Sequence, residues 1–369
     1  MAKKRKTLPK NFQELIDAKD IPALKAVFDV CEIDAYDGAN RETALHYYNV
    51  PDEFARWVVA QGLDINVRDH YERTPLHRQA IVGSDSVNVL LELGADVHAK
   101  DKYDSDTPLH MAAEHHEATV RTLIAHGADV NAKNNAGITP LSYALAHGAN
   151  IDIHNLAAIA DVLLNAGAEI TTDMPQSVER IGKYFEFYRA DFHKDCIAET
   201  EAGLAHLYEL FHVEPVAKRQ TYDGKAPIVV PYGNWGKQHD ALWQLLVPGQ
   251  GQAKTVQGEV IRLTGKLAWE IMDNGGCNWD VNFRKMLAAL PEYFGKGNPL
   301  PSDELKDSKH LAKQLRGGSG GGGSSRNRGG SGGGGGSGGN EPERLMELAV
   351  HWVQANHNPI ALGKTKYKR

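Results

Sequence analysis

The sequence has few cysteines and no long hydrophobic run. Its three cysteines, Cys31, Cys196 and Cys277, lie far apart and form no CxxC pair, so neither a disulfide framework nor a thiolate zinc site is expected. No run of about 18 apolar residues occurs, so no membrane-spanning helix is expected. We therefore expect a cytoplasmic protein with no membrane association, no metal site and no cofactor.

Glycine is in excess in one segment only. Of the 37 glycines, 15 lie in residues 317–339, a glycine and serine tract with almost no apolar side chain. A coil of this length spans roughly 25 Å, and we expect a flexible linker that is either natural or engineered. The remaining composition is that of an ordinary globular protein, and 369 residues predict about two domains.

A short phrase recurs along the first half of the chain. It reads TALH at residues 43–46, TPLH at 74–77, TPLH at 107–110 and TPLS at 139–142. Proline is favourable at the first position of a helix, and a preceding threonine can cap the helix. Glycines at 62, 94 and 127 follow helical stretches and predict left-handed helix ends. Each unit therefore starts and ends helices at fixed places.

With a unit of about 33 residues and this tetrapeptide, residues 11–170 resemble the ankyrin-repeat family. The resemblance implies an all-α solenoid of turns and antiparallel helix pairs, and it implies that the recurring histidines bridge neighbouring repeats. We expect a disordered basic tail over residues 1–10. An ankyrin domain should follow over 11–172, made of a capping unit and about four repeats.

The departures from the family pattern indicate where a partner binds. Bulky or polar side chains replace the usual alanines after the first two tetrapeptides, and about eight extra residues, 148–155, lengthen the fourth repeat. By resemblance, binding residues lie on the turn tips and first helices. The predicted partner-binding residues are Tyr47, Tyr48, Tyr71, Arg73, Arg78, Tyr103, Asp104, Met111 and Glu114.

Charge is distributed unevenly along the chain. Residues 11–172 contain 11 basic and 25 acidic side chains, a balance of −14, whereas residues 173–369 contain 25 and 22, a balance of +3. An acidic array should attract a basic protein and repel nucleic acid. We therefore expect a basic protein partner, bound on an acidic concave surface, and no direct binding of nucleic acid.

Residues 173–369 have helical periodicity without the repeat signature, and they resemble only uncharacterised bacterial proteins. Residues 273–280 are expected to form a turn in which Asp280 caps the next helix. A second site in this domain could use Gln257, Glu259, Arg262, Asp273 and Asn274, although the spacing of Glu259 and Arg262 favours a structural ion pair. The expected helices are 176–188, 197–211, 239–247, 255–272, 282–293, 303–315 and 343–354.

Three functions are compatible with these patterns. The first is a protein-binding inhibitor, in its concrete form an immunity protein that neutralises a basic toxin. The second is an enzyme with a site in the helical domain near Glu259, Arg262, Asp273 and Cys277, with the array as a recruiting arm. The third is a passive adaptor that links two proteins. We expect the first, because the repeats account for nearly half of the chain and ankyrin arrays carry no catalytic centre.

Overall fold

The computed structural model describes residues 3–148, 152–189, 192, 194–220, 222–317 and 341–368. The chain forms two compact units. The repeat unit comprises Met1–Phe185 and Phe192–Ala217, and the helical unit comprises Glu186–Asp191 and Lys218–Arg369. The linker predicted at 317–339 lies outside the described residues except for its first glycine, and part of the predicted insertion at 148–155 lies outside them too.

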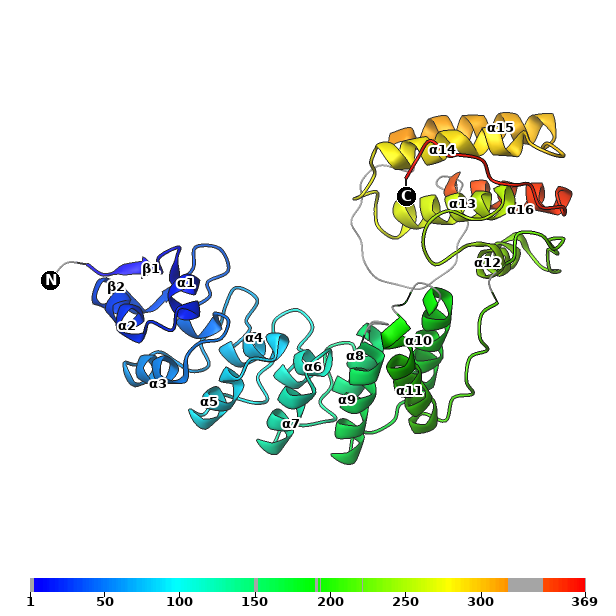
Figure 1. The fold of residues 1–369 in the computed structure, drawn as a ribbon. Coiled ribbons are helices and arrows are strands. Elements are labelled where there is room, and N and C mark those ends of the chain that lie inside the picture. The colour runs from blue at the N-terminus through cyan, green and yellow to red at the C-terminus, as the bar shows by residue number, and fades with distance from the viewer. Residues whose placement is uncertain are drawn as a thin grey trace. The chain divides into compact units, whose positions relative to one another are not determined.

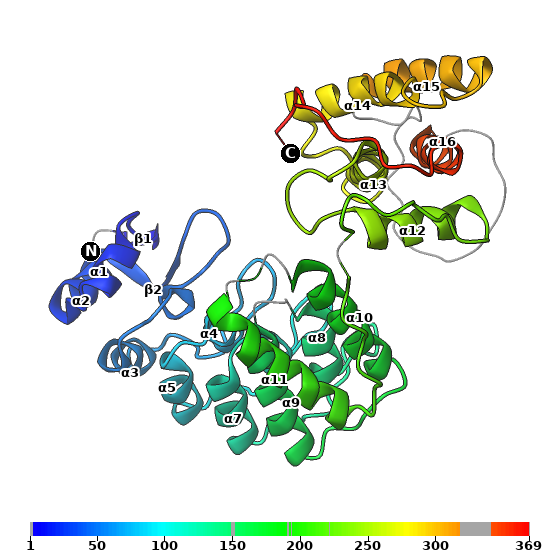
Figure 2. The same cartoon turned by 45° about the vertical axis from the view of Figure 1, so that its right-hand side comes forward.

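In the repeat unit, helices stack in two rows (Figures 1 and 2). The inner row packs α4 on α6 and α6 on α8, and the outer row continues from α3 through α5, α7 and α9 to α11. The helices are α3 (Asp52–Ala60), α4 (Pro75–Val82), α5 (Ser86–Glu92), α6 (Pro108–Ala113), α7 (Glu117–Ala125), α8 (Pro140–His147), α9 (Ile153–Asn165), α10 (Met174–Tyr188) and α11 (Lys194–Leu210).

The helix ends follow from the predicted signals. Helices α4, α6 and α8 begin at the prolines, each behind an extended threonine. Gly62, Gly94 and Gly127 have φ of 101°, 90° and 86°, values that favour glycine because side chains with a Cβ rarely adopt them. The tetrapeptides therefore set the period of the array.

The array extends further than the sequence indicated. We placed its end at residue 172, yet most of α10 and all of α11 belong to the repeat unit. Arg180 of α10 donates from Nη2 to the carbonyls of Leu145 and Ala146 in α8, each at 3.0 Å. Helices α10 and α11 extend the stack without a tetrapeptide of their own. The sequence signature therefore ends before the array does.

The prediction of a disordered tail over residues 1–10 is wrong for its described part. Strand β1 (Arg5–Thr7) pairs in parallel with β2 (Cys31–Tyr36), and the ammonium of Lys4 donates to the carbonyl of Phe28 at 2.6 Å. Two of the basic residues, Arg5 and Lys6, lie in this exposed strand, which backbone pairing can form without apolar side chains. The predicted capping unit is present as α1 (Phe12–Asp17) and α2 (Ile21–Val30).

The first repeat is irregular at its inner helix. Only a 3-10 turn, η1 (Ala44–His46), forms there, and Tyr47 is already extended. The fully buried amide of Gln79 donates to the carbonyls of Leu45 at 3.1 Å and Tyr47 at 2.6 Å. A glutamine in place of the usual alanine therefore satisfies the backbone groups that the short helix leaves unpaired.

The helical unit has a separate core. Helix α13 packs against α12, α14 and α16, while α15 packs against α14 and α16 (Figure 1). No helix in the described part of the chain is both long enough and apolar enough to cross a bilayer. The helices are α12 (Trp235–Leu246), α13 (Val256–Met272), α14 (Val281–Phe294), α15 (Ser302–Gln314), a 3-10 turn η4 (Leu315–Gly317) and α16 (Glu341–Ala355).

Candidate protein-binding surface

One aspartate or asparagine organises the turn that precedes each inner helix. In the second turn, Oδ1 of Asp69 accepts hydrogen bonds from the amides of Tyr71 at 2.8 Å and Arg73 at 2.9 Å. Asp37, Asp101 and Asn134 accept equivalent bonds in the other three turns. We did not single out these residues from the sequence, although their recurrence five or six positions before each threonine is a usable signal.

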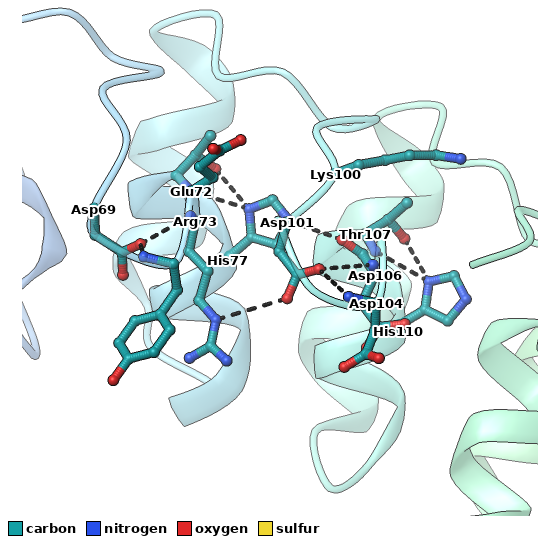
Figure 3. A network of polar contacts seen from close by, with 12 residues as sticks. Asp69, Glu72, Arg73, His77, Lys100, Asp101, Asp104, Asp106, Thr107 and His110 are labelled. Carbon is teal, nitrogen blue, oxygen red and sulfur yellow. Dashed lines mark hydrogen bonds and ion pairs between the residues drawn. The ribbon is translucent and has the colours of Figure 1, made fainter. Parts of the chain in front are cut away.

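Neighbouring turns are hydrogen-bonded to one another. The amide of His70 donates to the carbonyl of Asn40 at 2.7 Å, Lys102 donates to Tyr71 at 3.1 Å, and Asn135 donates to Asp104 at 2.7 Å. Figure 3 shows how closely the side chains of two successive turns approach. We call this row of joined turns, residues 37–42, 69–73, 101–106 and 134–138, the turn surface.

Buried histidines hold the turns against the helices. In the tetrapeptide of α4, Nδ1 of His77 accepts from the amide of Thr74 at 3.2 Å, and its Nε2 donates to the carbonyl of Asp106 at 3.1 Å. Burial lowers the pKa of His77 to about 4 and also lowers the pKa of His46 and of His110. These side chains are neutral near pH 7, and their role is structural.

Arg78 of α4 lies beside Tyr48, which follows the 3-10 turn η1. The guanidinium of Arg78 lies 5.4 Å from the ring centre of Tyr48 and donates from Nη2 to its hydroxyl at 3.1 Å. The same nitrogen is 3.1 Å from Oε1 of Glu42. Tyr48 remains 44% exposed, so this cluster presents an aromatic ring with a neutralised cation.

A second cluster lies on the turn surface. The rings of Tyr71 and Tyr103 are 6.0 Å apart, and the guanidinium of Arg73 lies 5.1 Å from the ring of Tyr71. Nε of Arg73 is 3.9 Å from Oδ2 of Asp101 (Figure 3). Tyr103 is 57% exposed and Asp104 is exposed beside it. Four predicted residues therefore form one accessible group.

Three other predicted residues are less accessible. Met111 is buried in the array core at 8% exposure, so its prediction as a contact residue is wrong: the side chain fills the space between the helix rows. Tyr47 is half-buried, with its ring 5.0 Å from that of Phe12. Glu114 is half-buried, with Oε1 3.5 Å from Nε2 of His115.

Three of the acids of the turn surface are buried. Asp69, Asp101 and Asp106 are buried within it, at 5%, 6% and 3% exposure, because their carboxylates bond the turns themselves. The exposed acids of the array include one after each outer helix: Asp64, Asp96 and Asp129. Exposed acids therefore lie on the turn surface, at Glu72 and Asp104, as well as around it.

In the helical unit, three predicted site residues are fully buried on α13. Glu259 and Arg262 form a bidentate ion pair at 2.9 and 2.6 Å, and the hydroxyl of Tyr367 donates to Glu259 at 2.9 Å. Gln257 donates to the carbonyls of Asn356 and Asn358 and accepts from the amide of Ile360. These hydrogen bonds hold residues 356–367 against α13, so the role of the three side chains is structural.

The other two predicted residues lie at the opposite end of that helix. Asn274 donates to both oxygens of the buried Glu270, at 3.1 and 3.0 Å, and Asp273 is exposed. From residue 257 to residue 273 a helix rises about 24 Å. The five residues therefore do not form one site.

Comparison with known proteins agrees with the repeat geometry. The family model described as ankyrin repeats (3 copies) matches residues 85–174, which include α5 to α9. No curated protein matches the chain. The stacked helix pairs, the histidine bridges and this match lead to one conclusion: the chain contains ankyrin repeats.

Proposed function

We propose that the repeat unit binds a basic protein and that the protein acts as an inhibitor of that partner, in the manner of an immunity protein that neutralises a toxin. The observation that carries the proposal is the exposed group of Tyr103 and Asp104 on hydrogen-bonded turns. Tyrosine supplies a large contact area with few rotatable bonds, and it is enriched among residues that dominate binding energy. A rigid row of turns reduces the entropy lost on binding.

Charge supports a basic partner. The repeat unit contains 19 basic and 32 acidic residues, a net charge of −13. Because exposed acids lie both on the turn surface and around it, they would attract a cationic protein and accelerate its encounter. Close contacts would then depend on Tyr48 and Tyr103, with Asp104 and Glu114 as acceptors.

The test uses the full chain as bait in extracts and compares two double variants. Tyr103→Ala/Asp104→Ala should weaken binding of a stoichiometric partner by about tenfold or more. The matched control, Tyr232→Ala/Asp240→Ala, removes an exposed tyrosine and an exposed aspartate of the helical unit and should leave binding unchanged. Equal weakening by both variants would contradict the proposed surface.

Two further measurements test separately whether the partner is basic and whether this protein inhibits it. Affinity for the partner should fall between about 50 and about 300 mM salt if charge attraction contributes, since screening shortens the range of exposed charges. The partner's own activity should be lost at one equivalent of this protein if it is an inhibitor. Retained activity in the saturated complex would instead favour an adaptor.

A further inference from the structure

A groove in the helical unit is lined by cations without acids. It lies between α14 and α15, which pack side by side (Figures 1 and 2), and it encloses about 600 Å³. Its apolar floor includes Ala288 and Ala312. The five charged residues that line it are Arg284, Lys285, Lys309, Lys313 and Arg316, all of them exposed.

The positions of these cations follow helical periodicity. On α15 and the turn after it, Lys309, Lys313 and Arg316 fall on one face, while Glu304 and Asp307 fall on the opposite face. There Arg344 of α16 bonds Asp307 at 3.0 Å and lies 3.9 Å from Glu304. The acids of α15 are therefore turned away from the groove.

The groove cations are not neutralised by neighbours. Among the described residues, none of the five cationic side chains takes part in an ion pair or a hydrogen bond, although the backbone carbonyl of Arg316 accepts from Nε1 of Trp279 at 3.1 Å. Five unpaired cations around one hollow repel one another, and their potentials add, so the groove should attract an anion with several charges.

A second hollow continues the basic surface around α14. It encloses about 220 Å³ and shares Lys285 and Ala288 with the groove. Lys296, Lys364 and Lys366 also line it, with Glu292 as its one acid. Together the two hollows present eight cations and one carboxylate along α14, a helix about 21 Å long.

We propose that this surface binds the phosphodiester backbone of nucleic acid. A backbone with regularly spaced charges can follow cations around both sides of α14. An acidic helix would fill one groove and leave the other cations unmatched. Lysine and arginine side chains at the rim of a groove reach phosphates readily.

This inference differs from the sequence-based expectation of no direct nucleic-acid binding. That expectation followed from the acidic repeats and from a balance of only +3 over residues 173–369. That net charge sums over all sides of the domain, so it does not show how charge is distributed on each face. In the fold, the buried Glu259 is paired inside and the acids of α15 face α16, so the cations dominate one side.

The experiment measures binding of the full chain to labelled single strands and duplexes of about 20 nucleotides, at about 50 to 200 mM salt. We expect binding to at least one form, with affinity falling steeply as salt rises. The groove variant Arg284→Gln/Lys313→Gln should weaken binding about tenfold and reduce the salt slope by about 2. The control, Lys225→Gln/Lys237→Gln, removes two exposed lysines of the same unit and should change affinity less than about threefold.

Three results would overturn the proposal. One is no binding to either form at about 50 mM salt. Another is equal weakening by the groove and control variants, which would show an effect of net charge alone. The third is displacement by polyglutamate at matched charge as readily as by unlabelled nucleic acid, which would assign the groove to an acidic protein. If the groove variant melts at a lower temperature than the parent, Lys309→Gln/Arg316→Gln tests the same groove.

Discussion

The two units use charge in opposite ways. The repeat unit has a net charge of −13, whereas the helical unit has 22 basic and 15 acidic residues, a net charge of +7. In the repeats, buried aspartates such as Asp69 accept backbone amides of their own turn. In the helical unit, the buried Glu259 joins residues about a hundred positions apart. Asp69 thus acts within its own turn, whereas Glu259 also reaches a distant segment of the chain.

The largest predicted effect on stability concerns the buried network of Glu259, Arg262 and Tyr367. Glu259→Gln should destabilise the helical unit by about 3 to 5 kcal/mol, because it leaves the buried Arg262 without a counter-charge. Hydrogen exchange should show faster exchange in the helical unit and unchanged exchange in α4 to α8. The exposed Glu292→Gln is the control and should change stability by under about 0.5 kcal/mol. A loss of protection spread over both units would contradict the comparison.

In the repeats, the corresponding test is Gln79→Ala. It leaves the carbonyls of Leu45 and Tyr47 without their donor and opens a small cavity, so we expect a loss of about 2 to 3 kcal/mol. Chemical denaturation gives the value. Gln13→Ala removes an exposed amide that also bonds a carbonyl, that of Tyr48, and should cost under about 0.5 kcal/mol. Similar costs for the two variants would argue against a special role of the buried amide.

Acid should weaken the array through its histidines. A histidine with a pKa of about 4 in the fold, such as His77, and about 6.5 when unfolded binds fewer protons in the folded state between these values. The free energy of unfolding therefore falls as pH falls from 6.5, by about 2 kcal/mol for His77 at pH 5. His77→Gln should flatten this dependence in the repeats. His239, lowered to about 4 by burial in the helical unit, should retain its own dependence in that variant.

The smallest effect is expected at the surface. Arg56 and Glu92 form an ion pair between neighbouring repeats, with both side chains about half exposed. Glu92→Gln should cost less than about 1 kcal/mol, since water and salt screen exposed pairs. The difference should shrink in about 1 M salt. A loss as large as that of Gln79→Ala would show that surface charge, rather than buried polar bonding, joins the repeats.

Local signals allowed the helices to be predicted. The prolines at 75, 108 and 140 begin α4, α6 and α8, and Asp280 caps α14 by accepting from the amides of Asn282 and Phe283. Each signal acts within a few residues, so it can be read without knowing the fold. The predicted helices of residues 173–369 all correspond to observed helices within a few residues.

Features that depend on distant partners could not be predicted in this way. Nothing near Gln79 indicates that it serves carbonyls more than thirty residues earlier. The separation of Gln257 from Asp273 along one helix was readable, but the burial of Glu259 by Tyr367 was not. Met111 was placed on the surface because the sequence did not reveal which face of α6 meets the core.

The attachment of residues 356–367 to α13 has a consequence for synthesis on the ribosome. Neighbouring repeats can pack as soon as each pair has emerged, since their contacts span about one repeat. Helix α13 cannot complete the shell around Glu259 until Tyr367 has left the exit tunnel, more than a hundred residues later. At about 5 to 20 residues per second this delay lasts several seconds. During that interval Glu259 and Arg262 of the nascent helical unit would lack the cover of Tyr367 and would be accessible to chaperones.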